Sequence, residues 1–389
     1  MRELDLRLSN IIEGEYKTRV TKCNHFYINK AFKIDFLYFD DNSIDFSEEY
    51  VDSNYKIIYF DDLDGEIKIK YNGILDGTTG VYPYVREKTE DPFYILRHET
   101  CYYPMWYEPN TNEYFNHLIN PPLEDLFSVK VVVNDNRAMC SNLKYQQNEY
   151  VGYNPTIVVG DYVTNEYFFG ELSYVNLEES IIKDTVNTIK SVNDYMNRYK
   201  VATIEDYKII VIPEGYGSFV LQNTMFITKD SLMNKQQLIH ELVHTNWNPQ
   251  CDEKCQRSRF FDEAITQYFT YRICDCYKIK SASETEEEYL QSYVDIMTTY
   301  DITPTPIIKY GDEGLGDLSY SFGALALIAL EKAIGIEEMD VCLKVLLKEY
   351  DEKQVNFELF RDLFPLKTKH VFDEYFYSDY ASKEFLKKN

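Results

Sequence analysis

Several features are scarce or missing in this sequence, and each absence excludes a class of protein. No apolar run reaches the 18 residues that a membrane span needs; the most apolar stretch, residues 324–333, already contains Glu331 and Lys332. Acidic residues number 65 and basic ones 40, so a net charge of −25 leaves no basic excess for nucleic acid or an anionic membrane. The first residues, M-R-E-L-D-L, lack the apolar core of a signal peptide. We therefore expect a cytoplasmic protein without nucleic-acid or membrane partners.

Cysteine is also sparse, with eight residues, and no signal peptide for an oxidising compartment is visible in the first residues. Thiols are therefore expected rather than disulfides. Four of the eight fall close together in the sequence: Cys251, Cys255, Cys274 and Cys276. A second metal site or a redox pair could use such a group, but C-x3-C and C-x-C are not the usual zinc-ligand spacings. The spacing favours ordinary loop and core thiols.

The two parts of the chain follow different hydrophobic patterns. Residues 1–175 alternate aromatic and β-branched runs with turn clusters such as Asp76-Gly77, which is typical of short antiparallel strands. Residues 176–389 are dominated by apolar residues at helical spacing, and no internal repeat or low-complexity linker interrupts the chain. We expect an α+β protein of two domains, in which an antiparallel β domain precedes a mixed, mostly helical domain.

Individual elements of the second domain can be predicted from the same periodicity. The expected elements are a helix at 177–199, strands at 207–212 and 219–227, surface loops at 281–288 and 311–316, and helices at 324–335, 339–350 and 357–363. A further helix is expected to begin near Tyr289, directly after the first of these loops.

The most specific motif is His240-Glu241-Leu242-Val243-His244, in a segment of helical character. Histidines four residues apart lie on one face of a helix. Two neutral imidazoles in this arrangement can bind one Zn²⁺, and the Glu between them can accept a proton from the attacking water. Because the chain has only six His, a chance H-E-x-x-H match is rare, with odds on the order of one in a hundred.

A catalytic zinc needs a third protein ligand, and two His with one Glu is a known set. Eighteen residues separate His244 from Glu263. Apolar residues around Glu263 recur at helical spacing, so this Glu lies near the start of a second amphipathic helix. An acid at that position also complements the helix dipole, a role that Asp262 could serve equally well. The order H-E-x-x-H, x18, E favours Glu263 as the third ligand of one Zn²⁺ per chain.

These motifs resemble those of the gluzincin peptidases, the group that contains aminopeptidase N and leukotriene hydrolase. The family's second motif usually reads N-E-G, where this chain has Asp262-Glu263-Ala264. Tyr320-Ser321-Phe322-Gly323 is similar to the family's Y-x-K-G, with Phe322 in the place of the Lys. The segments 103–109 and 158–162 resemble family segments of the N-terminal domain, and the similarity extends from about residue 90 to 365.

The resemblance implies a thermolysin-like catalytic domain after the β domain. It also implies that Glu241 is the general base, that Tyr320 stabilises the oxyanion, and that His240, His244 and Glu263 hold the zinc. Larger family members continue with a helical C-terminal domain. This chain stops near where that domain would begin, so we expect a more open cleft.

One departure from the family concerns substrate binding. Family aminopeptidases carry G-x-M-E-N ahead of the zinc helix, and its Glu binds the amino terminus of the substrate. If Gly217 matches the motif's Gly, then Ser218 and Phe219 follow and Val220 takes the position of the Glu. These residues are expected to form an edge strand that pairs with an extended peptide. Glu99 is the candidate for a replacement anchor, with a solvated surface acid as the alternative reading.

The sequence thus predicts a zinc-dependent peptidase with a peptide substrate, and it leaves exopeptidase and endopeptidase action open. Two alternatives remain. One is hydrolysis of a non-peptide substrate at the same zinc site, and the other is a non-catalytic peptide-binding module with the same fold. Intact metal ligands and an intact general base argue against the module, because a scaffold has no need of a base.

Overall fold

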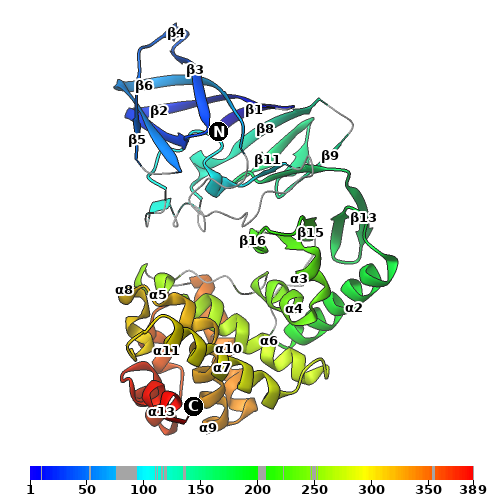
Figure 1. The fold of residues 1–389 in the computed structure, drawn as a ribbon, viewed down its shortest axis with the longest axis vertical. Coiled ribbons are helices and arrows are strands. Elements are labelled where there is room, and N and C mark those ends of the chain that lie inside the picture. The colour runs from blue at the N-terminus through cyan, green and yellow to red at the C-terminus, as the bar shows by residue number, and fades with distance from the viewer. Residues whose placement is uncertain are drawn as a thin grey trace. The chain divides into compact units, whose positions relative to one another are not determined.

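The computed structural model describes residues 1–9, 11–51, 54–75, 94–109, 111, 113–114, 117, 121–134, 137–199, 207–221, 223–245, 247, 251, 253–352 and 355–388. The chain forms two compact units (Figure 1), of which the first comprises Met1–Leu177 and Tyr207–Lys229 and the second comprises Glu178–Asp206 and Asp230–Asn389. The first is rich in strands and the second in helices, which confirms the expected α+β class. The units differ from the predicted division at residue 175 because the strands within 207–229 group with the first unit.

The first unit contains a large sheet of nine described strands: β1 (Arg2–Leu8), β2 (Ile12–Asn29), β3 (Phe32–Phe39), β4 (Asn42–Ser43), β5 (Ser47–Tyr50), β6 (Tyr55–Gly73), β8 (Phe127–Val133), β10 (Lys144–Gln146) and β11 (Glu149–Gly152). Their order is β10-β11-β8-β1-β2-β6-β3-β4, and β5 also pairs with β6. In β1, Leu4, Leu6 and Leu8 are buried while the charged residues between them are exposed, which is the alternation of a half-buried strand. One described pair of this large sheet departs from the expected antiparallel pattern, because β1 and β8 run parallel.

Two smaller sheets belong to the same unit. One has the order β7 (Tyr94–Leu96), β12 (Ile157–Gly160), β9 (Ala138–Ser141). The other has the order β13 (Val163–Tyr167), β14 (Gly170–Tyr174), β15 (Tyr207–Ile212), β17 (Thr224–Thr228), β16 (Phe219–Leu221). Parallel neighbours flank β15, whose nearly continuous apolar run suits a strand buried on both faces. The prediction of one strand at 219–227 is wrong, because the chain reverses there and β16 pairs antiparallel with β17.

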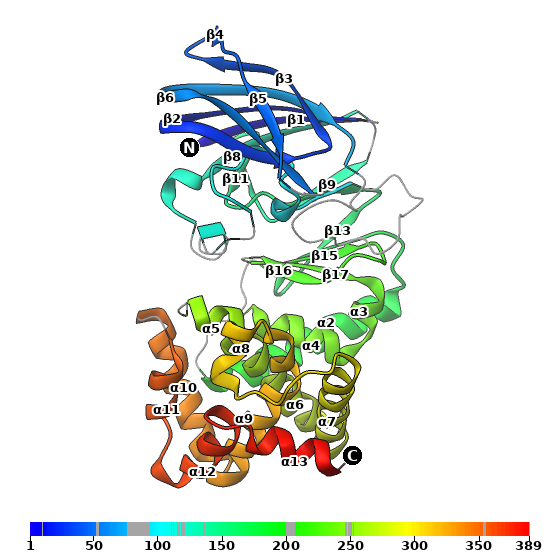
Figure 2. The same ribbon diagram turned by 60° about the vertical axis from the view of Figure 1, so that its left-hand side comes forward.

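The second unit is helical (Figure 2). Its described α-helices, with α3 starting at the unit boundary, are α2 (Glu179–Met196), α3 (Lys229–Met233), α4 (Lys235–His244), α5 (Glu253–Ser258), α6 (Ile265–Cys276), α7 (Ala282–Thr299), α8 (Tyr310–Glu313), α9 (Phe322–Ile334), α10 (Ile336–Glu352), α11 (Phe357–Asp362), α12 (Lys369–Val371) and α13 (Tyr380–Lys388). α6 packs against both α4 and α9, and α9 is buried along most of its length, as expected for a central helix. Among the residues that the structure describes, no helix has both the length and the apolar character needed to cross a membrane.

Shorter helical turns connect these elements in both units: η1 (His98–Thr100), η2 (Leu123–Asp125), η3 (Asn197–Tyr199), η4 (Phe260–Ala264), η5 (Ile307–Lys309), η6 (Gly316–Tyr320), η7 (Leu366–Thr368) and η8 (Phe372–Phe376). The helices predicted at 177–199, 324–335, 339–350 and 357–363 are present as α2, α9, α10 and α11, with their ends shifted by a few residues. The predicted turn at Asp76-Gly77 lies outside the described residues.

Both predicted surface loops are wrong. The polar segment 281–288 forms the start of α7, because Ser281 caps the helix and Glu284 completes a capping box. The segment 311–316 forms most of α8 and the first residue of η6, and Gly314 ends α8 with a positive φ. A Cβ at Gly316 would lie 2.7 Å from the carbonyl oxygen of Arg257, so this glycine permits close packing against α5. In both segments, polar and small residues mark helix ends.

Candidate metal centre

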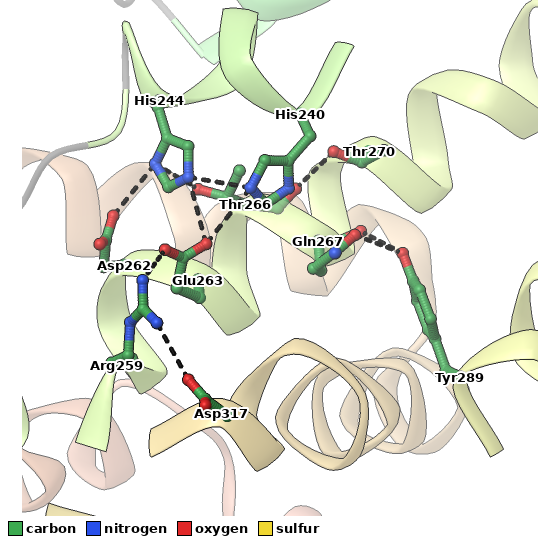
Figure 3. A network of polar contacts seen from close by, with 10 residues as sticks. All are labelled: His240, His244, Arg259, Asp262, Glu263, Thr266, Gln267, Thr270, Tyr289 and Asp317. Atoms are coloured by element: carbon green, nitrogen blue, oxygen red, sulfur yellow. Dashed lines mark hydrogen bonds and ion pairs between the residues drawn. The ribbon is translucent and has the colours of Figure 1, made fainter. Parts of the chain in front are cut away.

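α4 presents both histidines of the H-E-x-x-H motif on one face. The helix begins after Asn234, whose side-chain oxygen accepts hydrogen bonds from the backbone N–H groups of Gln236 and Gln237. Burial of its apolar face fixes the rotation of the helix and leaves His240 and His244 turned toward η4 and α6 (Figure 3). The buried residues of that face are Leu238, Ile239, Leu242 and Val243.

Glu263 comes from η4, a π-helical turn that leads directly into α6. Arg259, just before η4, has a φ of 55°, a left-handed conformation that is uncommon outside glycine. Phe260 and Phe261 are buried, and the indole N–H of Trp247 donates to the carbonyl of Phe261 at 2.8 Å. These contacts fix the π-helical turn, a feature frequent at functional sites. The turn brings Glu263 opposite the two histidines.

The three predicted ligands converge on one point (Figure 3). The Nε2 atoms of His240 and His244 are 3.0 Å apart, and the Oε2 of Glu263 lies 3.2 Å from each of them. Tetrahedral zinc with bonds of about 2.05 Å needs donor separations of about 3.3 Å. Among the described residues, this is the only group of three or more His, Cys, Asp or Glu whose donor atoms could share an ion. Both the donor set and its spacing fit zinc.

Hydrogen-bond partners orient the imidazole of His244. Its Nδ1 lies 3.0 Å from a carboxylate oxygen of Asp262 and 3.3 Å from the hydroxyl of Thr266. A carboxylate at Nδ1 favours the tautomer with the proton on that nitrogen, which leaves Nε2 free for a metal. The Nδ1 of His240 is buried and has no hydrogen-bond partner in the described part of the chain. The sequence suggests only a helix-dipole role for Asp262, although its place beside Glu263 is a signal for this contact.

The charges of the ligand triangle are strongly coupled. Burial opposes the charged form of His244, but Asp262 and Glu263 outweigh it and raise the pKa of His244 well above its ordinary value. Burial likewise opposes ionisation of Glu263, yet His244 and His240 hold the pKa of this carboxyl well below its usual range. Burial raises the pKa of Glu241, and the two imidazoles offset part of that rise. The shift moves Glu241 toward the neutral range in which a general base works best.

Tyr320, at the end of η6, lies beside the ligand triangle. Its ring and the imidazole of His240 are nearly parallel, with centroids 6.1 Å apart. The hydroxyl of Ser319 donates to the carbonyl of Ser258 at 2.7 Å, which ties η6 to α5. Burial, followed by the negative charge of Glu263, raises the pKa of Tyr320. The phenol is therefore protonated at neutral pH and can donate a hydrogen bond.

The first two residues of α9, Phe322 and Gly323, pack against different neighbours. A Cβ at Gly323 would lie 2.7 Å from the Cβ of Ala264, so the close approach of α9 to η4 requires glycine. Phe322, where the resembling family has Lys, is buried against Tyr293 and Tyr375, with ring centroids 4.7 and 5.3 Å away. This departure from the family pattern therefore places a core residue there.

Arg259 is a site residue that the sequence analysis missed. Its Nη2 donates to the Oε1 of Glu263 at 2.8 Å, and its Nη1 donates to Asp317 at 3.1 Å (Figure 3). The guanidinium carbon lies 4.9 Å from the centre of the Tyr320 ring. The only signal in the sequence is its spacing of four residues from Glu263, which is common between unrelated charges on helices.

Comparison with known proteins identifies the fold. No family model and no curated protein matches the sequence. Native LTA4 hydrolase from yeast is similar in structure, with a TM-score of 0.64 and 15% identity over 97% of this chain and 67% of that chain. The M1 zinc metallopeptidase from Deinococcus radiodurans has a TM-score of 0.61 and 12% identity over 99% of this chain and 92% of that chain. This chain has the fold of the M1 zinc metallopeptidases and LTA4 hydrolase.

Two liganded structures share this M1 fold. Yeast LTA4 hydrolase in complex with bestatin has a TM-score of 0.62 and 16% identity over 96% of this chain, which spans 65% of the yeast chain. A mutant of the Deinococcus enzyme bound to a Tyr-Ser-Ala substrate has a TM-score of 0.58 and 12% identity, over 99% of this chain and 92% of that one. The predicted resemblance to the aminopeptidase N and leukotriene hydrolase group is thus confirmed at the level of the fold.

The predicted substrate strand of this M1 fold lies in the first unit. β16 is an edge strand, because in its sheet it pairs with β17 alone among the described strands. Val220 is paired with Met225 in the register of this hairpin. The hydroxyl of Ser218 accepts a hydrogen bond from the backbone N–H of Thr228 at 3.2 Å, and open space surrounds the Cβ position of Gly217. The role of these residues in substrate binding stays a prediction.

Phe219 and Glu99 are the remaining residues that the sequence predicts for substrate binding. Phe219 stacks on Phe226 with centroids 4.6 Å apart, and the guanidinium of Arg97 lies 3.3 Å above the Phe219 ring. Glu99 belongs to η1, but its side chain lies outside the described residues. Its role as an anchor for the substrate's amino terminus also stays a prediction.

The group of four cysteines does not form a second metal centre among the described residues, where the His–His–Glu triangle is the only cluster of metal-binding side chains. Cys255 and Cys274 are buried, Cys251 is half-buried and Cys276 is exposed. Burial raises the pKa of Cys274 to about 11, so this thiol is protonated at neutral pH. The structure therefore agrees with the interpretation of core and loop thiols.

Proposed function

We propose that this chain is a zinc-dependent metallopeptidase that hydrolyses peptide bonds. The observation that carries the proposal is the triangle of two imidazole nitrogens and one carboxylate oxygen, with edges of 3.0, 3.2 and 3.2 Å. The likeness of the fold to the M1 zinc metallopeptidases supports it. His240, His244 and Glu263 would hold the ion, and three protein ligands leave a fourth position for water or substrate.

The remaining site residues have roles that follow from their chemistry. A bound zinc ion would supply a Lewis acid and an activated water at the open position. Glu241 neighbours a ligand without belonging to the triangle; it accepts the proton released during attack and passes it to the leaving amine. Tyr320 donates its phenolic hydrogen bond to the oxyanion that develops on the substrate carbonyl.

The proposed substrate is an extended peptide that pairs with the edge strand β16 through main-chain hydrogen bonds. An M1 relative of the same fold has been solved with a Tyr-Ser-Ala substrate, which supports a peptide. If Gly217 matches the motif's Gly, Val220 takes the position of the amine-binding Glu, and we propose on this basis that a free amino terminus is not required. Acetylated and free forms of one peptide library should then be cleaved at similar rates. Removal of single residues from free amino termini alone would contradict this part of the proposal.

Zinc content and one conservative substitution test the central proposal. Purified protein should contain about one Zn²⁺ per chain by elemental analysis. Glu241→Gln should keep the metal and lower the hydrolysis rate by roughly 10²- to 10⁴-fold, because only the proton acceptor is removed. Glu287→Gln, at an exposed position of α7, makes the same chemical change away from the site and serves as the matched control. A wild-type chain that binds no zinc refutes the proposal.

Hydrolysis of a non-peptide substrate is the second candidate, because the neighbour with the highest TM-score given above is an LTA4 hydrolase. Its zinc centre would be the same, so zinc content does not separate the two. Turnover does separate them: the second candidate predicts a zinc-loaded protein that cleaves small ester or lipid-like substrates but leaves a peptide library intact. A zinc-loaded protein that binds peptides and cleaves nothing would instead favour a non-catalytic module.

A further inference from the structure

Arg259 lies between Glu263 and Asp317 (Figure 3). Its Nη2 donates to the Oε1 of Glu263 at 2.8 Å, while its Nη1 donates to Asp317 at 3.1 Å. The same guanidinium lies 4.9 Å from the centre of the Tyr320 ring. One planar cation therefore contacts the third ligand candidate, the candidate oxyanion donor and η6 together.

The contact with Arg259 makes the two oxygens of Glu263 unequal. Oε1 accepts from the guanidinium, whereas Oε2 lies 3.2 Å from the Nε2 of His240 and of His244. Only 6% of the Glu263 side chain is exposed, so water cannot readily replace the guanidinium on Oε1. One oxygen, rather than two, is thus directed to the imidazoles, and this preserves an open fourth position for a metal.

The ion pair with Asp317 does not explain this arrangement by itself. The Asp317 side chain is 83% exposed and that of Arg259 is 41% exposed, and ion pairs with such exposure contribute little to stability. Arg259 nevertheless adopts a backbone φ of 55°. Residues with a Cβ persist in that conformation where surrounding contacts hold them, often at functional sites. The contacts with Glu263 and Tyr320, rather than the exposed ion pair, explain why Arg259 is held in this conformation.

We propose that Arg259 is a positioning residue of this site, which fixes Glu263 through Oε1 and holds the Tyr320 ring in place beside it. The proposal rests on the proposed zinc function. A guanidinium suits this role because its planar fork can contact a carboxylate, a second acid and an aromatic face together, whereas an ammonium is a single point charge. The positive charge repels a nearby dication, so the orientation of Glu263 has to outweigh that repulsion.

Zinc affinity measures directly whether the orientation of Glu263 by Arg259 outweighs the charge repulsion. The only ligand in this experiment is Zn²⁺. The metal-free full chain is titrated against a chelating dye for the wild type, Arg259→Met, Arg259→Lys and the control Arg257→Met. Arg257 is exposed near the end of α5, so its variant removes the same charge two residues away. Arg259→Met should weaken zinc binding by roughly 10- to 100-fold, which is the usual effect of losing the partner of a metal ligand. The zinc affinity of Arg259→Lys should lie between those of the wild type and Arg259→Met. The affinity of Arg257→Met should match that of the wild type.

A kinetic readout separates positioning from a merely structural role. With saturating zinc, Arg259→Met should lower kcat for a fluorogenic peptide by about tenfold and leave KM unchanged, because the hydrogen bond from Tyr320 to the oxyanion is made only in the transition state. Circular dichroism checks that each variant is folded.

Each outcome bears on one proposal only. A wild-type chain without zinc refutes the proposed function. A wild type that binds zinc, together with an Arg259→Met variant of equal affinity and equal kcat, overturns the positioning role and leaves the zinc function intact. If Arg259→Met does not fold, Arg259→Lys decides: an affinity equal to that of the wild type overturns the proposal, because the charge without the fork would then suffice.

Discussion

Removal of the Asp262 carboxylate should weaken zinc binding by about tenfold. Its oxygen lies 3.0 Å from the Nδ1 of His244, and losing such a partner of a metal ligand usually reduces affinity by roughly 10- to 100-fold. Two features favour the lower end of this range of affinity loss. The Asp262 side chain is 43% exposed, and the hydroxyl of Thr266 lies 3.3 Å from the same nitrogen and can replace it. A tenfold loss corresponds to about 1.4 kcal/mol of binding free energy.

Competition with a chelating dye measures this loss in Asp262→Ala. Asp262→Asn keeps an oxygen that can accept from Nδ1, so it should lose less affinity than the Ala variant. Adding Thr266→Val to Asp262→Ala removes both partners of His244, and the loss should approach about 100-fold. Asp312→Ala removes an acid that pairs with Lys254, and it should leave the zinc affinity unchanged. Zinc affinity of Asp262→Ala within twofold of the wild type would refute this account of how His244 is oriented.

Three further outcomes follow from the geometry. Tyr320→Phe should lower kcat by roughly 10²- to 10³-fold at unchanged zinc affinity, as steady-state kinetics and zinc titration can check. In the metal-free protein, the raised pKa of His244 adds stability that is complete below about pH 6.5 and is lost as pH rises through the folded-state value. The Tm of chelator-treated protein should therefore fall as the pH rises above about 6.5, and a flat profile would contradict this coupling. Gly323→Ala places a Cβ 2.7 Å from that of Ala264 and should destabilise the fold by about 1–3 kcal/mol in denaturant unfolding.

The sequence located the elements whose signal is a local repeat. The helices α2 and α9 follow from apolar residues at helical spacing, and the central strand β15 from a continuous apolar run. The two loop predictions fail for one reason: polar composition does not distinguish a loop from a helix end. The polar and acidic composition of residues 281–288 predicts a loop, although Ser281 and Glu284 of this segment cap α7.

The residues of the candidate site also differ in whether a local sequence pattern predicts them. His240 and His244 could be identified together because four residues in a helix bring two side chains onto one face, whatever the rest of the chain does. The family spacing then identified Glu263 and Tyr320, although neither could be shown to meet the histidines without a fold.

Tertiary structure alone decided which groups surround these residues. Asp262 and Thr266 reach the outer nitrogen of His244, and Arg259 reaches Glu263 and Tyr320, because η4, α6 and η6 pack together. No periodicity encodes such contacts, since each depends on the rotation of one element against another and on backbone conformations such as the left-handed Arg259. The sequence therefore determined which residues could hold a metal, and the packing of the helices determined which groups orient them.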